Sequence, residues 1–212
     1  MRLTTEAGKR GTGFIVDYSN GKAIVTAKHL CNGEREEVLH FHQAWGSHAP
    51  TTGLLDRVGP LDAPGDVAAF DLPESLWPEW YGGRVPTSSS GLIVSQDCFI
   101  LGYPYDLSTE LGSGQEAPLV KKGILAGGLS AGGVATWCID IHANPGFSGG
   151  PLICPLPGKN GSFVYAGVVI GSMLVPAVEP KEQQPEPLLI PSGLSQCVDV
   201  KALGVLGITE TV

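Results

Sequence analysis

The run NPGFSGGPL, residues 144–152, places Ser148 in a glycine-rich turn that leads into an apolar segment. A serine hydroxyl is a poor nucleophile at neutral pH, so it needs a base in contact and N–H donors for the developing oxyanion. Glycine at position 146 lets the main chain turn so that the N–H groups of Gly146 and Ser148 can converge. The small residues Gly149 and Gly150 leave room for the main chain of a substrate. The run predicts a nucleophile turn with an oxyanion hole; a plain glycine-rich turn before a buried strand is the alternative.

The candidate base is His29, because it closes the β-branched run of residues 23–28 and would be held at the end of a rigid strand. Four other histidines are present: His40, His42, His48 and His142. His40 and His42 would share one face of a strand, which could suggest a metal pair. No third ligand stands at a useful spacing, so we expect ordinary surface histidines and no metal.

The candidate acid is Asp66, which precedes the apolar run Val67–Phe70. A charged residue beside such a run needs a partner, and a carboxylate that accepts from an imidazole N–H would fix the tautomer of the base. Three other aspartates lie nearby: Asp56, Asp62 and Asp71. A solvated carboxylate in a turn therefore stays open as the other interpretation of Asp66.

The order of these residues along the chain separates the known triad arrangements. The turn also satisfies the Gly-x-Ser-x-Gly pattern of α/β-hydrolases, but those enzymes need a histidine after the serine, and none follows His142. A subtilisin-like order needs an acid well before the histidine, and only Glu6 and Asp17 precede His29. No cysteine sits in a glycine-rich turn, which disfavours a cysteine nucleophile. The order that remains, base then acid then nucleophile, is the chymotrypsin order.

Four segments together resemble bacterial trypsin-like serine peptidases and occur in the same order over nearly the whole chain. They are Gly11–Val16 with Ile24–His29, then Asp66–Phe70, Gly102–Pro104 and Asn144–Leu152. The resemblance implies an all-β fold of two six-stranded antiparallel β-barrels with the active site in the cleft between them. It assigns residues 1–85 to the first barrel and residues 86–212 to the second. His29 and Asp66 would come from the first barrel and Ser148 from the second.

The same resemblance implies where a substrate would bind. The strand at Ile170, Gly171 and Ser172 would pair with the substrate main chain beside the primary pocket. His142, six residues before the nucleophile, would lie at the pocket floor and suggest a polar or acidic substrate side chain; a histidine unrelated to substrate is the alternative. Because no pocket aspartate is evident, a preference for lysine or arginine is not expected.

Phe147 marks a departure from the family pattern. Secreted digestive members have an aspartate at this position, which captures a newly cut N-terminus. We therefore expect a nucleophile turn that forms without proteolytic activation.

The predicted function is a serine endopeptidase that uses no cofactor and acts on protein or peptide. A catalytically silent binding or regulatory module, and an esterase with the same triad, are the alternatives.

The composition agrees with short strands and many turns, since 30 glycines and 17 prolines occur in 212 residues and only 16% of residues are charged. A net charge of −8 argues against nucleic acid or an anionic membrane as the main partner. The five cysteines form no Cys-x-x-Cys pair, so we expect small buried hydrophobes in a reducing compartment, with a single disulfide left open. The oligomeric state is not predicted.

Four further expectations concern particular segments. No signal peptide is visible at the N-terminus, and residues 165–178 are too short and too interrupted to span a bilayer, which predicts a soluble, cytoplasmic protein. Residues 81–91 are the best linker candidate. Long loops are expected over residues 108–118 and 179–191, the second too proline-rich to join a central strand. One helix is expected near residues 194–203, with Ser192 or Ser195 as its cap.

Overall fold

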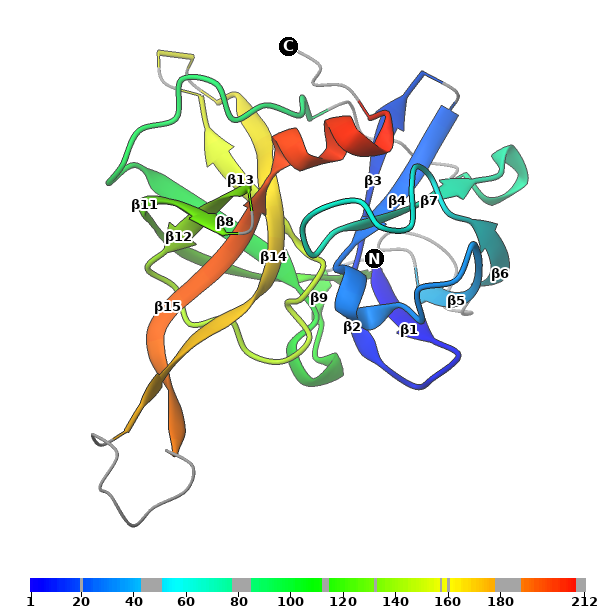
Figure 1. The fold of residues 1–212 in the computed structure, drawn as a ribbon, viewed down its shortest axis with the longest axis horizontal. Coiled ribbons are helices and arrows are strands. Elements are labelled where there is room, and N and C mark those ends of the chain that lie inside the picture. The colour runs from blue at the N-terminus through cyan, green and yellow to red at the C-terminus, as the bar shows by residue number, and fades with distance from the viewer. Residues whose placement is uncertain are drawn as a thin grey trace.

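The computed structural model of this protein describes residues 1–19, 21–42, 51–77, 85–111, 115–131, 133–156, 158–159, 161–177 and 188–208. Within these ranges the chain is built of β-strands, with four short 3-10 helices between them (Figure 1). The strands of the first half are β1 (Arg2–Thr5), β2 (Arg10–Thr12), β3 (Phe14–Tyr18), β4 (Gly21–Thr26), β5 (Glu36–His42), β6 (Thr51–Asp56) and β7 (Ala68–Leu72). Those of the second half are β8 (Asp97–Gly102), β9 (Thr109–Leu111), β10 (Gln115–Ala117), β11 (Leu119–Ala131), β12 (Val134–Ile139), β13 (Pro151–Pro155), β14 (Phe163–Pro176) and β15 (Leu189–Asp199). The helices are η1 (Lys28–Leu30), η2 (Glu74–Leu76), η3 (Pro104–Asp106) and η4 (Val200–Leu206).

The first half forms two antiparallel sheets, with strand orders β2-β1-β5-β6 and β3-β4-β7. Side chains alternate along β5, where Leu39 and Phe41 are fully buried and His40 and His42 point to the other face. An isolated bridge between Arg57 and Phe70 joins the two sheets beyond β6. The described residues therefore show the first barrel as two joined sheets rather than as one closed ladder of six strands.

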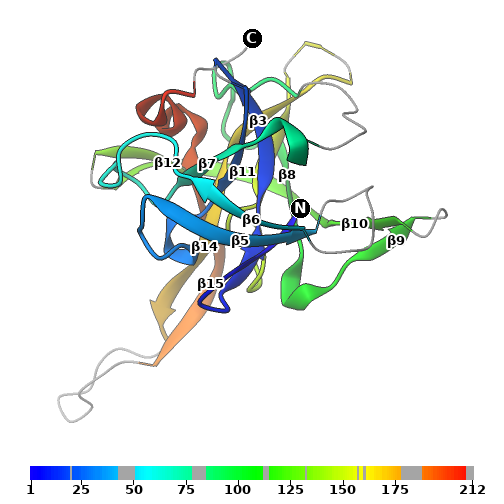
Figure 2. The same cartoon turned by 90° about the vertical axis from the view of Figure 1, so that its right-hand side faces the viewer.

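The second half is a closed barrel of six strands in the order β11-β12-β15-β14-β13-β8. Its interior is filled by fully buried side chains such as Ile100, Leu152 and Val169. The segment expected as a loop over residues 108–118 instead contains a hairpin of β9 and β10, which projects away from the barrel (Figure 2). All-β architecture with a barrel in the second half is thus confirmed.

A shared core joins the two halves. Phe14 of β3 and Val16 belong to one apolar cluster with Val168 of β14, Val198 of β15 and residues of η4. Residues from both ends of the chain are needed to bury this cluster, so the halves pack as one unit. The division at residue 85 remains a prediction.

The C-terminal helix begins later than the sequence suggested. β15 continues through Asp199, and η4 starts at Val200. The helix cap is Asp199, whose side chain accepts a hydrogen bond from the N–H of Lys201 at 2.8 Å. Neither Ser192 nor Ser195 caps it. The prediction placed the helix too early because residues 194–199 carry the apolar side chains of a buried barrel strand, and their pairing with β12 and β14 decides their conformation.

The strands β14 and β15 extend well past the barrel as a two-stranded arm (Figures 1 and 2). Their paired residues include Leu174 with Pro191 and Pro176 with Leu189. The expected loop over residues 179–191 is therefore strand from Leu189 onward, and its proline-rich part, residues 179–187, lies outside the described residues.

Only part of the expected linker can be described, because residues 81–84 lie outside the described ranges. Beyond them, the N–H of Ser88 bonds to the Tyr165 carbonyl at 3.0 Å, and Tyr165 in turn donates to the Pro86 carbonyl at 2.8 Å. This stretch of the connection is therefore fastened to β14. Among the described residues, no helix has the length and apolar character that crossing a membrane requires.

Candidate active site

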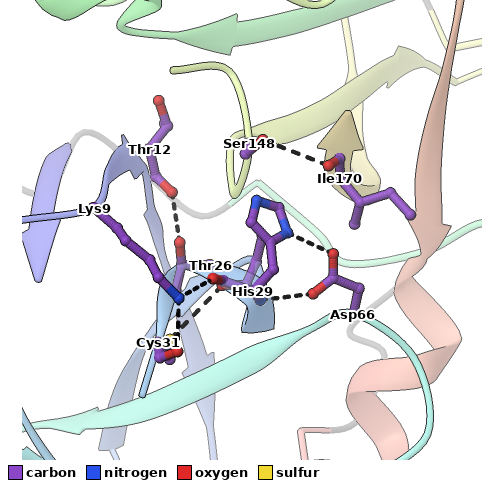
Figure 3. A network of polar contacts seen from close by, with 9 residues as sticks. Lys9, Thr12, Thr26, His29, Cys31, Asp66, Ser148 and Ile170 are labelled. Carbon is purple, nitrogen blue, oxygen red and sulfur yellow. Dashed lines mark hydrogen bonds and ion pairs between the residues drawn. The ribbon is translucent and has the colours of Figure 1, made fainter. Parts of the chain in front are cut away.

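His29 and Asp66 are held together by two hydrogen bonds (Figure 3). His29 lies in η1, immediately after β4, and its Nδ1 is 2.6 Å from Oδ2 of Asp66. The main-chain N–H of His29 also donates to Oδ1 of the same carboxylate at 2.8 Å. Both carboxylate oxygens are therefore used, and the ring is oriented with Nε2 away from Asp66. This is the arrangement that a base and its orienting acid require.

Ser148 lies in the turn just before β13. In Figure 3 the edge of the His29 ring that is not bonded to Asp66 faces this turn. The Ser148 hydroxyl donates to the Ile170 carbonyl over 3.5 Å, which is a long and weak bond. Its main chain is held firmly, because the Ser148 carbonyl accepts from the N–H of Thr12 at 2.8 Å. The hydroxyl can therefore rotate while the backbone that carries it stays in place.

Two N–H groups beside Ser148 point away from the hydrogen-bonded carbonyls of their own peptide units. The Pro145 carbonyl accepts from the N–H of Tyr105 at 3.0 Å, and the Phe147 carbonyl accepts from the N–H of Gly150 at 2.9 Å. In a trans peptide the N–H points opposite to the carbonyl, so Gly146 N–H and Ser148 N–H point away from these partners. Neither N–H donates a hydrogen bond to any described residue. These are the two donors that the sequence predicted for an oxyanion.

Glycine is required at two positions of this turn. Gly146 has φ of +102°, and a Cβ there would collide with the Tyr103 carbonyl and lie 2.9 Å from Cα of Pro104. Gly149 has φ of +82°, and a Cβ there would collide with the Thr12 carbonyl. Both positions combine a left-handed backbone with a close approach of neighbouring main chain, which no L side chain tolerates.

Thr12 contacts this turn twice, a role that sequence analysis missed. Its buried hydroxyl donates to the Gly146 carbonyl at 2.7 Å and accepts from the N–H of Tyr103 at 3.1 Å. Its N–H donates to Ser148, and its carbonyl accepts from the hydroxyl of Thr26 at 2.7 Å. The only signal in the sequence was a threonine between two glycines. That pattern does not show that the hydroxyl bonds to a residue 134 positions further along the chain.

Lys121 of β11 is a second residue that the sequence did not single out. Its Nζ donates to the His142 carbonyl at 2.7 Å and to Oδ1 of Asn144 at 2.6 Å. It also stands 5.5 Å from the ring centroid of Phe147, a distance at which a cation is attracted to the ring face. Phe147 itself is fully buried. The loop before the nucleophile is thus held by an apolar anchor and one lysine.

The predicted substrate strand lies next to the nucleophile. A bulge in β14 makes Ile170 an extra residue between Val169 and Gly171, and the Ile170 carbonyl faces Ser148. The Ser172 hydroxyl donates to the Ala143 carbonyl at 2.8 Å and so ties β14 to the loop before the nucleophile. His142 is in that loop and half-buried, but no contact of its side chain is described. Its place at a pocket floor remains a prediction.

The remaining candidate nucleophiles and ligands do not join this site. All five cysteines are free and buried, and burial raises the pKa of the Cys31, Cys98 and Cys154 thiols to about 12. His40 Nδ1 is 2.8 Å from the hydroxyl of Thr52. The described part of the chain holds no cluster of three side chains suited to a metal ion, and His48 lies outside it.

An all-β fold with a histidine–aspartate pair facing a serine in a glycine turn defines the serine peptidases of the chymotrypsin type. The family model described as "Trypsin-like peptidase domain" matches residues 11–158, so the chain belongs to the trypsin-like peptidases and is a serine-type endopeptidase. No curated protein sequence matches this chain.

Solved structures share the fold at low sequence identity. The Rv3671c protease from M. tuberculosis, in its inactive form, is 19% identical with a TM-score of 0.59, over 97% of this chain and 87% of that one. The serine endoprotease from Yersinia pestis is 18% identical with a TM-score of 0.57, over 97% of this chain and 61% of that one. The HtrA-type protease AlgW, solved with a decapeptide, is 20% identical with a TM-score of 0.54, over 91% of this chain and 49% of that one.

Proposed function

We propose that this protein hydrolyses peptide bonds through His29, Asp66 and Ser148. Nε2 of His29 takes the proton of the Ser148 hydroxyl as Oγ attacks the substrate carbonyl carbon. Asp66 keeps the ring oriented and stabilises the imidazolium that forms. The 2.6 Å contact between His29 Nδ1 and Asp66 Oδ2 is the observation that supports this assignment most directly.

The negative charge that develops on the substrate oxygen would be bound by the N–H groups of Gly146 and Ser148. Both donors are oriented before substrate arrives, because the carbonyls of Pro145 and Phe147 already have partners. Such preorganised donors contribute most of the stabilisation in acyl-transfer sites. The imidazolium then protonates the leaving amine as the C–N bond breaks. His29 then takes a proton from a water molecule, which attacks the acyl ester. The imidazolium returns the proton to Oγ of Ser148 as the acid product leaves.

The substrate chain would lie antiparallel to β14. We call the residue before the cleaved bond P1 and count P2, P3 and so on toward the substrate N-terminus. The P1 N–H would donate to the Ile170 carbonyl. P3 would pair with Ser172, and Gly171 between these two positions would not contact the substrate main chain. The Ile170 carbonyl beside Ser148 supports this pairing. His142 would face the P1 side chain, and a preference for polar or acidic P1 residues is the consequence to test.

The surroundings of the protein are also a proposal. Five reduced, buried cysteines fit a reducing compartment such as the cytoplasm. The working unit would comprise both halves, residues 1–85 and 86–212, since the nucleophile and its base come from different halves.

A fluorophosphonate probe tests the triad. The expected result is one adduct on Ser148 that Ser148→Ala abolishes, together with cleavage of denatured casein by the unmodified protein. Casein cleavage would exclude a silent binding module, and comparison of peptide with ester hydrolysis separates a peptidase from an esterase. An adduct on another residue, or none at all in a folded protein, would contradict the assignment.

A further inference from the structure

Among the described residues, one edge of β14 has no strand paired to it from the nucleophile outward. β13 pairs with β14 as far as Val168, and the next residue, Val169, exchanges hydrogen bonds with Gly149 and Gly150. From Ile170 to Pro176 no described strand lies on this edge, while β15 covers the other one. The free edge begins at the carbonyl that faces Ser148 and continues onto the arm (Figure 1).

The pairing pattern tells which main-chain groups face this free edge. The N–H of Ala177 donates to the Leu188 carbonyl at 2.7 Å, so these two residues form a hydrogen-bonded pair. In an antiparallel ladder such pairs alternate with pairs whose N–H and C=O groups point outward. The register is regular from Leu174 to Pro176. The main-chain groups of Leu174 and Pro176 therefore point to the free edge.

The same alternation holds at the base of the arm. Val169 points outward, because its N–H and carbonyl bond to the turn after Ser148. The bulge inserts Ile170, so Gly171 faces β15 and Ser172 faces outward again. The outward series is then the Ile170 carbonyl, Ser172 and Leu174. A second register shift against β15 lies between Ser172 and Leu174, where β14 itself has only Met173 between the two residues.

Prolines limit the pairing on both edges of the arm. Pro176, the next outward position after Leu174, has no N–H to donate. Pro191, which lies opposite Leu174 on β15, removes an outward donor from the other edge. Edge prolines prevent a strand from being extended by further chains. Leu174 is therefore the last residue of the free β14 edge that offers both a donor and an acceptor.

We propose that Leu174 is a main-chain binding position for P5 of an extended polypeptide substrate, and that it prefers an apolar P5 side chain. The proposal rests on the peptidase function and on antiparallel pairing along Ile170 and Ser172. Because P1 meets Ile170 and P3 meets Ser172, P5 meets Leu174. Directly opposed residues present their side chains on the same face, and the Leu174 side chain is 55% exposed. A P5 leucine or valine would cover it.

The substrates selected in this way are unfolded segments with at least five residues before the cleaved bond. Recognition would come mainly from the main chain, so it would tolerate many sequences, with an apolar residue favoured at P5. Extending the substrate to P7 should raise kcat/KM little. Pro176 has no N–H, so P7 can form only one hydrogen bond there, to the Pro176 carbonyl.

N-methylated peptides test the pairing position by position. The probe is a fluorescence-quenched decapeptide that contains the fastest-cleaved bond of denatured casein after its seventh residue. One peptide carries an N-methyl group at P5, a matched control carries it at P6, where the N–H points away from β14, and a third carries it at P3. We expect kcat/KM to fall about tenfold for the P5 peptide and to change less than about twofold for the P6 peptide.

The enzyme side uses two substitutions of one residue. Leu174→Pro removes the N–H, and Leu174→Ala keeps it while shortening the side chain. The kcat/KM for the parent peptide should fall more for Leu174→Pro than for Leu174→Ala, because only the proline lacks the N–H that would donate to the P5 carbonyl. Replacing an apolar P5 by aspartate should lower kcat/KM for the unmodified protein and less for Leu174→Ala.

The outcomes separate this inference from the function on which it rests. A large P3 effect with equal P5 and P6 effects would leave the peptidase and its β14 pairing in place and overturn the role of Leu174. Equal kcat/KM values of the two Leu174 variants for the parent peptide would overturn it as well. A protein that cleaves none of the peptides and forms no Ser148 adduct would overturn both proposals.

Discussion

Thr12→Val removes one hydroxyl that touches the oxyanion turn and keeps the shape of the side chain. The Thr12 hydroxyl donates to the Gly146 carbonyl and accepts from Tyr103 N–H, and the residue is only 2% exposed. Valine leaves a buried acceptor and a buried donor without partners. We expect a loss of about 1 to 3 kcal/mol in the free energy of unfolding, since a buried unsatisfied group costs about this much.

The same substitution should slow catalysis through the position of one donor. The Gly146 carbonyl belongs to the peptide unit next to the one that carries the Gly146 N–H, so freeing it loosens that donor. Complete removal of an oxyanion donor costs about 10²- to 10³-fold in kcat. Tyr105 still holds the Pro145 carbonyl in the variant, so we expect about a tenfold fall in kcat with little change in KM.

The rate constant for fluorophosphonate labelling of Ser148, and steady-state hydrolysis of the casein-derived decapeptide, measure this effect. Both are recorded at a temperature where thermal unfolding curves show each variant to be folded. Thr12→Ser keeps the hydroxyl and serves as the matched control, with restored kcat as its expected result. A folded Thr12→Val protein that labels and turns over as fast as Thr12→Ser would refute the positioning role.

Two further predictions concern the acid and the thiols. Asp66→Asn should lower kcat by about 10³- to 10⁴-fold while the fold is kept, because the amide cannot hold the His29 tautomer that accepts a proton at Nε2; a variant with unchanged kcat would exclude Asp66 as the orienting acid. Burial raises the pKa of the Cys31, Cys98 and Cys154 thiols to about 12, so at pH 8 they stay protonated. The folded protein should react with a disulfide reagent far more slowly than the denatured one, and rapid reaction of the native thiols at pH 8 would show that the barrels open.

The residues of the proposed site were found because they carry local signals in the sequence. Ser148 stands among glycines, two of which, Gly146 and Gly149, have a left-handed backbone, and His29 follows a β-branched strand. The order of His29, Asp66 and Ser148 along the chain then excluded two other hydrolase folds. The strands β4 and β7 were equally accessible, since burial in a sheet demands apolar residues in short runs.

Other parts could not be predicted because several structures satisfy the same local pattern. The residues before η4 are apolar enough for a buried helix or a buried strand, and pairing with β12 and β14 selects the strand. The hairpin of β9 and β10 forms in a segment whose composition resembled a loop. The role of Lys121 depends on the arrival of Asn144 and Phe147 from another part of the barrel.

The sequence alone predicted that Ser148 lies in a glycine-rich turn, and which histidine and aspartate could serve it. The tertiary structure decided how that turn is held, through Thr12 and Tyr105, and which edge of β14 has no partner strand among the described residues. The physical reason is the range of the interactions. Backbone preferences act over a few residues and are written in the local sequence, whereas the hydrogen bonds that hold the proposed oxyanion donors join segments that meet only after both halves have folded.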